Sequence, residues 1–325
     1  MRNSQESYFI FNGDADGLCA AHQIQLSGVP CKKVITGVKR DISLLKQIAD
    51  AHEQQLFVFD IAVEKNLAEL KILLQKKCKI TWFDHHVSEE IPTSPLFTNH
   101  IDTDPNTNTS MLVNQALKGK FAKWAVVGLF GDNLHQSAEL LAQELKISAG
   151  DTETFKELGT LLNYNAYGSD FSDIYFHPEE LFKQMKPFAE PLDFVKGTNI
   201  LESLRAGFAE DLKKAKKVEA IAKGIYIFPN EKWARRVIGV YANQLVSESP
   251  DSAMALLIGK GDASSGDETY LISVRAPING TLSAAALCKK FPTGGGRIKA
   301  AGINQLPKAQ LGDFVEAFSN YFVVE

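Results

Sequence analysis

The first 86 residues alternate short apolar runs with segments of helical periodicity, and this alternation constrains the fold more than any other feature. The runs are SYFIFNGD (7–14), CKKVITGV (31–38), QLFVFDIA (55–62) and CKITWFDHH (78–86). Helical patterns lie between them at 18–28, 41–53 and 64–77. Runs that are apolar throughout fit strands buried on both faces, and strand–helix alternation predicts a parallel sheet covered by helices.

The chain after residue 224 has a different pattern. Strand patterns occupy 225–230, 254–261 and 269–277, and helical patterns occupy 234–248, 282–291 and 311–322. A length of 325 residues suggests two domains. We therefore predict an α/β protein with a parallel-sheet domain at 1–190, a helical linker at 191–223 and a smaller α/β domain with a mixed sheet at 224–325.

Composition excludes several classes of partner. The net charge of −4 provides no basic field for long duplex DNA, although a local basic pocket could hold a small phosphorylated ligand. The four cysteines lie far apart and form no disulfide framework, which fits a reducing compartment. The N-terminus lacks the apolar core of a signal peptide, and no run approaches the ~18 apolar residues of a membrane span. We expect a cytoplasmic protein without a membrane partner.

Acidic residues share one position, the carboxyl end of a predicted strand or apolar run. In an open parallel sheet, ligand sites form at this edge. Crowded carboxylates repel one another and take up protons unless a divalent cation compensates them. Oxygen ligands with histidines suit Mn²⁺ or Mg²⁺, with Fe²⁺, Co²⁺ and Zn²⁺ as alternatives. The residues concerned are Asp14, Asp16, Asp60, Asp84 followed by His85 and His86, and Asp132.

Each of these residues also has an ordinary structural explanation. A single aspartate after a strand commonly serves as a turn residue or a helix cap. A single histidine such as His86 is more often a hydrogen-bonded structural residue than a metal ligand. Residue spacing alone leaves the metal site and these alternatives open.

Five short motifs resemble those of the DHH phosphoesterases. NGDADG, FVFD, FDHH and LFGDN occur in the order of that superfamily's four motifs. The superfamily includes RecJ-like exonucleases, oligoribonucleases, cyclic-dinucleotide phosphodiesterases and exopolyphosphatases. GGGRIKAAG (294–302) resembles the glycine-rich signature of the DHH-associated domain, and LISVRAP resembles the S-x-R strand before it. The resemblance covers nearly the whole chain.

The resemblance implies two divalent ions, Mn²⁺ or Mg²⁺, at a five-stranded parallel sheet. Matched by motif position, Asp14 would bind one ion, Asp16 the other and Asp60 both. His85 and Asp132 would complete the second site. Water between the two ions would attack phosphorus in line with the leaving oxygen, without a protein nucleophile.

Asp84 and His86 are implied to support catalysis from behind the ligands, where a carboxylate orients an imidazole by hydrogen bonding. No other catalytic motif competes with this scheme. The sequence contains neither a G-x-S-x-G nucleophile elbow nor a G-x-x-x-x-G-K-[ST] phosphate loop.

The C-terminal motifs supply candidate substrate contacts. The backbone N–H groups of Gly294, Gly295 and Gly296 could bind a phosphate, and Arg275 could grip one bidentately. The alternatives are a tight turn for the glycines and an ordinary strand residue for Arg275.

Two positions depart from the family pattern. Asn12 stands where many relatives have Asp or His, and its neutral carbonyl would bind a metal more weakly. Arg297 stands where the family has His; it can donate to a phosphate but stays charged at all physiological pH values. The alternative for Arg297 is a side chain turned to solvent.

These features predict a two-metal phosphodiesterase that hydrolyses short oligonucleotides or small dinucleotides. The binding partner is then a small phosphorylated substrate. The sequence leaves open whether the protein forms a homodimer. Two other functions remain: an exopolyphosphatase or pyrophosphatase, and a nucleotide-binding protein whose catalysis has weakened through changes such as Asn12 and Arg297.

Overall fold

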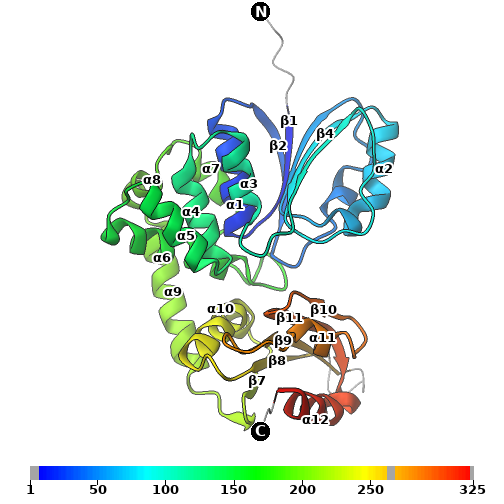
Figure 1. Ribbon diagram of the computed structural model, residues 1–325, viewed down its shortest axis with the longest axis vertical. Coiled ribbons are helices and arrows are strands. Elements are labelled where there is room, and N and C mark those ends of the chain that lie inside the picture. The colour runs from blue at the N-terminus through cyan, green and yellow to red at the C-terminus, as the bar shows by residue number, and fades with distance from the viewer. Residues whose placement is uncertain (1–6, 262–267, 323–325) are drawn as a thin grey trace, which may run out of the picture. The chain divides into compact units, whose positions relative to one another are not determined.

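The computed structural model describes residues 7–261 and 268–322 and divides the chain into two compact units. Unit 1 comprises residues 1–205 and unit 2 residues 206–325 (Figure 1). The division falls inside helix α9 (Ile200–Ala215). The predicted boundaries at 190 and 223 lie on either side of this helix.

Unit 1 contains a five-stranded sheet in which every neighbouring pair is parallel. Its order is β2-β1-β3-β4-β5, so the chain steps outward from β1 to β2 and then returns to β3 on the other side. The predicted parallel sheet is confirmed, and β5 is the strand that residue patterning did not reveal. The strands are β1 (Ser7–Asn12), β2 (Cys31–Gly37), β3 (Gln55–Phe59), β4 (Lys79–Asp84) and β5 (Phe97–Ile101).

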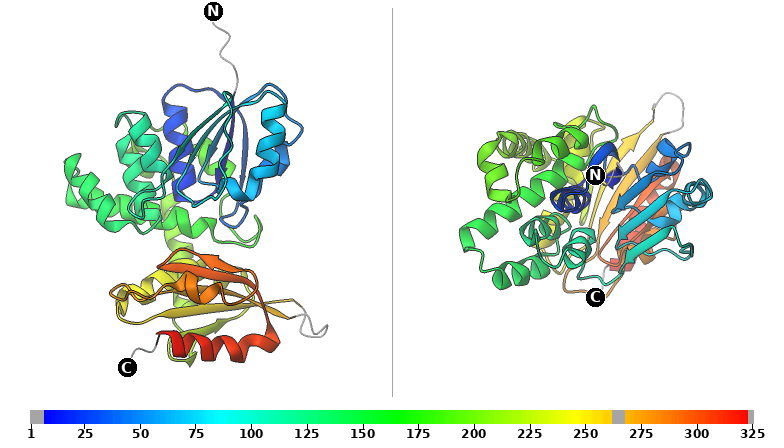
Figure 2. Two further views of the ribbon diagram at one scale, coloured as in Figure 1. Left: turned by 45° about the vertical axis from the view of Figure 1, so that its right-hand side comes forward. Right: turned by 90° about the horizontal axis from the view of Figure 1, so that it is seen from above.

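Helices cover both faces of this sheet (Figures 1 and 2). The larger group lies on the α1 side: α1 (Ala15–Leu26), α3 (Thr109–Ala116), α4 (Ala122–Gly131), α5 (His135–Glu144), α6 (Ala149–Ala166), α7 (Pro178–Met185) and α8 (Pro191–Gly197). The smaller group comprises α2 (Leu67–Gln75) and the short 3₁₀ helices η1 (Leu44–Ile48) and η2 (Val63–Asn66).

Alternate residues of β1 and β3 enter two different cores. Phe9 lies against Phe57, with ring centroids 5.6 Å apart, and against Phe182 of α7 at 6.0 Å. Ile10 and Val58 point to the other face, into the core formed with η1, η2 and α2. Burial on both faces explains why these strands are apolar throughout.

The helix predicted at 41–53 was wrong in extent, because only η1 forms there. The Asn66 side chain accepts a hydrogen bond from Leu45 N–H at 3.1 Å and donates to the Ile42 carbonyl at 2.7 Å. It thereby takes main-chain groups that a longer α-helix would have used.

Unit 2 contains a mixed six-stranded sheet of order β10-β11-β9-β8-β7-β6, in agreement with the predicted fold class. Only β7 and β8 pair in parallel. Its strands are β6 (Ala220–Ala222), β7 (Ile225–Phe228), β8 (Met254–Lys260), β9 (Thr269–Arg275), β10 (Gly294–Gly296) and β11 (Ala300–Pro307). Its helices are α10 (Lys232–Glu248), α11 (Ala284–Cys288), η3 (Lys308–Gln310) and α12 (Leu311–Phe322).

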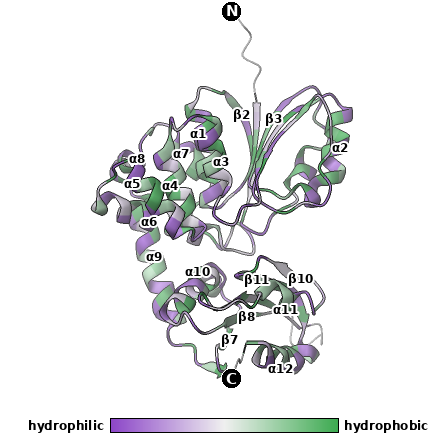
Figure 3. Ribbon diagram, in the orientation of Figure 1, coloured by the Kyte–Doolittle hydropathy of each residue, from purple (hydrophilic) through white to green (hydrophobic). Residues whose placement is uncertain are grey.

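Helix α12 closes the core of unit 2. It carries polar and apolar residues together, as its mixed colouring in Figure 3 shows. Phe314 and Phe318 are the buried residues of this helix, and they pack with Ile225 and Ile272 of the sheet. Within residues 7–261 and 268–322, every helix is too short or too polar to cross a bilayer.

A buried histidine makes unit 1 sensitive to acid. The His22 ring lies edge-on to Trp124, with centroids 4.7 Å apart, and its Nε2 lies 2.9 Å from the Phe188 carbonyl. Nε2 therefore carries the proton, while Nδ1 is buried with no hydrogen-bond partner among the described residues. Burial lowers the pKa of His22 to about 4.

We predict that acid destabilises the protein through His22. Between pH 6.5 and 4 the unfolded chain binds a proton at His22 that the folded chain does not. The free energy of unfolding therefore decreases as the pH is lowered, by up to ~3 kcal/mol. Urea unfolding of wild type and His22→Gln at pH 7 and pH 4.5 checks this. Wild type should lose about 2 kcal/mol more than the variant; equal losses would contradict the prediction.

Candidate metal centre

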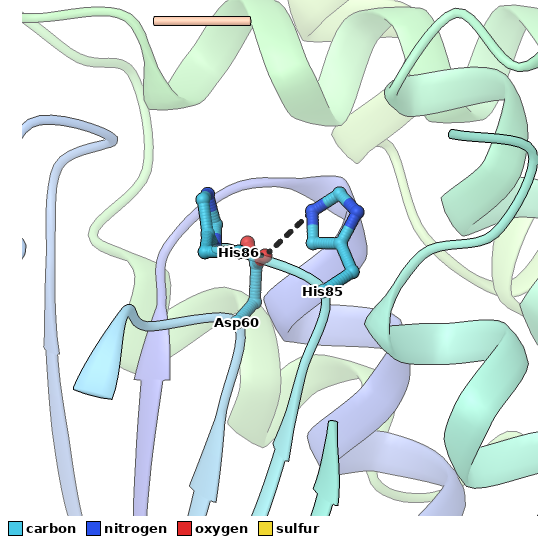
Figure 4. Close-up of side chains that lie close together, drawn as sticks. All are labelled: Asp60, His85 and His86. Atoms are coloured by element: carbon cyan, nitrogen blue, oxygen red, sulfur yellow. Dashed lines mark ion pairs between the residues drawn. The ribbon is translucent and has the colours of Figure 1, made fainter. Parts of the chain in front are cut away.

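The predicted acidic residues meet at the carboxyl edge of the unit 1 sheet. Asp84 ends β4. Asp60 follows β3, His85 and His86 follow β4, and these three side chains lie close together (Figure 4). Asp132 ends α4. We call four of these acids the carboxylate cluster: Asp14, Asp16, Asp60 and Asp132. Asp14, Asp16 and Asp60 are at most 3% exposed, and the Asp132 side chain is 5% exposed.

His85 could hold a metal ion through one of its ring nitrogens. Its Nδ1 lies 3.1 Å from the Thr107 carbonyl, so this nitrogen donates a hydrogen bond and Nε2 carries the lone pair in the neutral ring. Nε2 faces Asp60 Oδ1 at 3.4 Å and Asp132 Oδ2 at 3.7 Å. Electron-rich atoms face one another there, and a cation bound between them would stabilise this arrangement. Hydrogen bonding of the second ring nitrogen is typical of ligating histidines.

Asp132 is only partly compensated, by the Lys39 ammonium 3.9 Å from its Oδ1. Its Oδ2 is buried and has no hydrogen-bond partner among residues 7–261 and 268–322. It also lies at the C-terminal end of α4, where the helix dipole disfavours negative charge. A divalent cation bound between Asp132 and His85 would remove both penalties. The 3.7 Å separation is close to the ~3 Å between neighbouring ligands of an ion with ~2.1 Å bonds.

Asp16 joins α1 to α3 and experiences opposing electrostatic effects. It accepts hydrogen bonds from the N–H groups of Thr109, at 2.8 Å, and Ser110, at 2.6 Å, which favour its charged form. Burial and the carboxylates of Asp60 and Asp132 outweigh them and raise the pKa of Asp16 well above its ordinary value. The shift indicates a site with excess negative charge.

Asp60 is held in a backbone conformation that few residues adopt. Its φ of 55° lies in the left-handed region, which Asp tolerates better than most side chains. Its N–H donates to the Phe83 carbonyl at 3.0 Å, which ties the end of β3 to β4. Burial and the neighbouring Asp14 raise the pKa of Asp60 well above its ordinary value. Such strain concentrates at functional sites.

Asp84 orients His86 rather than His85. The Asp84 Oδ1 lies 2.7 Å from His86 Nδ1, and its Oδ2 is buried without a hydrogen-bond partner among the described residues. The His86 side chain is 36% exposed, whereas those of His85 and Asp60 are 4% exposed. Asp84 and His86 therefore form a hydrogen-bonded pair whose imidazole is more exposed than that of His85, and their supporting role in catalysis stays a prediction.

Two groups of described residues could each hold a cation, and they share His85. Two groups place potential ligand atoms within 4.8 Å of one another: Asp60 with His85 and His86, and Asp16 with His85 and Asp132. Both groups need His85. Because Nδ1 of His85 is engaged by the Thr107 carbonyl, only the Nε2 lone pair is free to bind, and it binds one ion. Asp14 belongs to neither group.

Asp14 is already compensated by a residue that sequence reasoning missed. It caps α1 by accepting from Gly17 N–H at 3.1 Å, and its other oxygen pairs with the ammonium of Lys39. The Lys39 Nζ also lies 3.3 Å from Asn163 Oδ1 and 3.9 Å from Asp132 Oδ1. Lys39 follows β2. A search for basic as well as acidic residues at the carboxyl ends of the predicted strands would have found it.

The Asn12 side chain makes hydrogen bonds to main-chain groups. Its Nδ2 donates to the Lys39 carbonyl at 3.1 Å, and its Oδ1 accepts from Asp14 N–H at 3.3 Å. Both polar atoms of the Asn12 side chain are therefore hydrogen-bonded at the ends of β1 and β2.

Burial alone would lower the pKa of Lys39, but the Asp14 carboxylate raises it above its ordinary value, so the ammonium stays charged.

Arg275 in unit 2 is buried and bonded to its own unit. Its guanidinium donates to Asn243 Oδ1 at 2.5 Å, Ser273 Oγ at 3.0 Å and the Val274 carbonyl at 3.1 Å. These contacts give Arg275 a structural role. Its role in phosphate binding stays a prediction.

The glycine-rich motif forms β10, and packing accounts for two of its three glycines. A Cβ on Gly294 would lie 1.8 Å from the Cys288 carbonyl oxygen, and one on Gly296, where φ is 136°, would lie 2.5 Å from Ala301 Cα. Gly295 has open space around its Cα. Arg297 is exposed in the connection from β10 to β11. A role of Gly295 and Arg297 in substrate binding stays a prediction.

Comparisons with known proteins agree at the level of the fold. No family model and no curated protein sequence matches the chain. Among solved structures, an exonuclease RecJ bound to manganese matches with a TM-score of 0.60 and 15% identity, covering 100% of this chain and 92% of that one. An exopolyphosphatase-related protein from Bacteroides fragilis matches with a TM-score of 0.52 and 13% identity, covering 98% and 92%.

A pGpG-specific phosphodiesterase from Vibrio also matches, with a TM-score of 0.51 and 10% identity, covering 98% of this chain and 99% of that one. Identities this low show a shared fold. The chain therefore has the fold of the DHH phosphoesterase superfamily, which confirms the resemblance that its motifs indicated.

Proposed function

We propose that this chain, which has the fold of the DHH phosphoesterases, is a divalent-metal-dependent phosphodiesterase acting on short oligonucleotides or small dinucleotides. The observation that carries the proposal is the convergence of His85 Nε2 with Asp60 and Asp132 oxygens in a buried space. Mn²⁺ or Mg²⁺ suits such a donor set.

The residues divide the chemistry between binding and proton transfer. Asp16, His85 and Asp132 would hold the cation, with Asp60 adjacent. A bound cation supplies a Lewis acid for a phosphoryl oxygen and makes a coordinated water more acidic. His86, whose Nδ1 is fixed by Asp84, presents Nε2 as the atom that takes a proton from water or gives one to the leaving group.

Several observations support a small substrate. The carboxylate cluster is nearly inaccessible, so a chain end fits the site better than the middle of a duplex. The net charge of −4 offers little attraction for long nucleic acid. The proteins of similar fold include an exonuclease and a pGpG-specific phosphodiesterase, both of which cut phosphodiester bonds between nucleotides.

Arg40 is a further candidate for binding substrate phosphate. It follows Lys39 at the carboxyl end of β2 and is partly buried. Burial lowers the pKa of its guanidinium from the high ordinary value of arginine. No hydrogen bond or ion pair to this guanidinium is found within the described ranges, 7–261 and 268–322. A phosphate would satisfy its donors bidentately.

We predict that Arg40→Gln raises KM by roughly tenfold or more, since a charge-assisted hydrogen bond contributes about 1.5–3 kcal/mol. Steady-state kinetics on the best substrate checks this, together with Mn²⁺ affinity by calorimetry, which should not change. Lys46→Gln removes a charge at an exposed position of η1 and serves as the control. An unchanged KM in Arg40→Gln would rule out this contact.

We predict hydrolysis of pApA or pGpG in the presence of Mn²⁺, with loss of activity on addition of EDTA. Asp60→Asn should lower kcat/KM by about a thousandfold, because several kcal/mol of transition-state stabilisation depend on the metal site. Hydrolysis of pApA, pGpG, cyclic dinucleotides, pAp and polyphosphate is measured in parallel.

The set of substrates that the protein hydrolyses distinguishes the candidate functions. Turnover of polyphosphate alone would replace the nucleotide substrate with an exopolyphosphatase activity. No turnover of any substrate, with tight nucleotide binding that needs no metal, would show a binding protein instead. Asp102→Asn, an exposed carboxylate at the end of β5, is the matched control for Asp60→Asn and should keep full activity.

A further inference from the structure

The carboxylate cluster contains a built-in cation, the Lys39 ammonium. Lys39 pairs with Asp14, lies 3.3 Å from Asn163 Oδ1 and lies 3.9 Å from Asp132 Oδ1. Its side chain is 22% exposed, so most of the residue is enclosed by unit 1. An ammonium in this position occupies the space beside Asp14 where a metal ion would need to approach.

The main chain of Lys39 is fixed from both sides. Its N–H donates to the Ala166 carbonyl at 2.9 Å, and its carbonyl accepts from Asn12 Nδ2 at 3.1 Å. Asn163 is fixed as well, because its Nδ2 donates to the Gly131 carbonyl at 2.7 Å. The fold therefore fixes both the main chain that carries the Lys39 ammonium and the Asn163 side chain beside it.

Asn12 and Lys39 form one structural unit. An aspartate at position 12 would have no donor for the Lys39 carbonyl, whereas the Asn12 amide both donates to this carbonyl and accepts from Asp14 N–H. The same substitution that removes a charged metal ligand therefore helps to place a positive charge on Asp14. Asn12 and Lys39 therefore act together at one end of the sheet.

We propose that this site binds one divalent cation per chain and that the Lys39 ammonium takes the place of a second. His85, Asp16 and Asp132 would hold the cation, whereas Asp14 is neutralised by Lys39. If all four carboxylates of the cluster are ionised, one divalent cation and one ammonium offset three of their four negative charges. A second divalent ion would have to displace Lys39 from Asp14 against electrostatic repulsion.

The proposal rests on the proposed metal-dependent function and is tested by metal stoichiometry rather than by activity. Mn²⁺ bound to the metal-free full-length chain is counted by calorimetry, and electron paramagnetic resonance distinguishes an isolated Mn²⁺ ion from a coupled pair. Wild type should bind one isolated ion. Lys39→Met should bind two, because Asp14 becomes available, and Lys39→Arg should bind one.

Lys123→Met is the matched control, since Lys123 pairs with Glu190 on the surface of unit 1, and it should bind one ion. Two ions in wild type, or only one in a folded Lys39→Met, would overturn the inference. If Lys39→Met does not fold, the wild-type count and its resonance spectrum still decide. A wild type that binds one ion but hydrolyses none of the substrates supports this inference and refutes the proposed function, whereas a wild type that binds no ion refutes both.

Discussion

Burial of like charges is the constraint on which the rest of this structure depends. The fold removes Asp14, Asp16, Asp60 and Asp132 almost completely from water. Isolated buried carboxylates are strongly disfavoured, and each must be paired, hydrogen-bonded or bound to a cation. Asp14 is paired with Lys39 and Asp16 accepts two backbone N–H groups, but Asp132 Oδ2 has no hydrogen-bond partner in the described part of the chain.

The scaffold accounts for this crowding. Strand order reverses between β2 and β3 around β1, and ligand sites of open α/β sheets form at such points. The left-handed Asp60 and the C-terminal position of Asp132 are both costly to stability. A protein that retains these costs in one place is expected to use that place for function.

Residue patterns revealed the strands that carry the site and the acids at their ends, because buried parallel strands are continuous apolar runs. They did not reveal β5, whose FTNHI sequence is mostly polar and lies at the sheet edge. They also missed Lys39 and Arg40, since a basic pair after a strand is ordinary until the fold places Lys39 on Asp14. The role of Asn12 was equally invisible, because it depends on the Lys39 carbonyl, 27 residues away.

We infer that the carboxylate cluster is a site for one divalent cation. Anomalous diffraction at the manganese edge, from crystals grown with Mn²⁺, would locate bound ions in the cluster. We expect a single peak within bonding distance of His85 Nε2, with Asp132 and Asp16 as carboxylate ligands and the Lys39 ammonium still on Asp14. No peak at the cluster, or two peaks with Asp14 bound to metal and Lys39 displaced, would contradict a site for one cation.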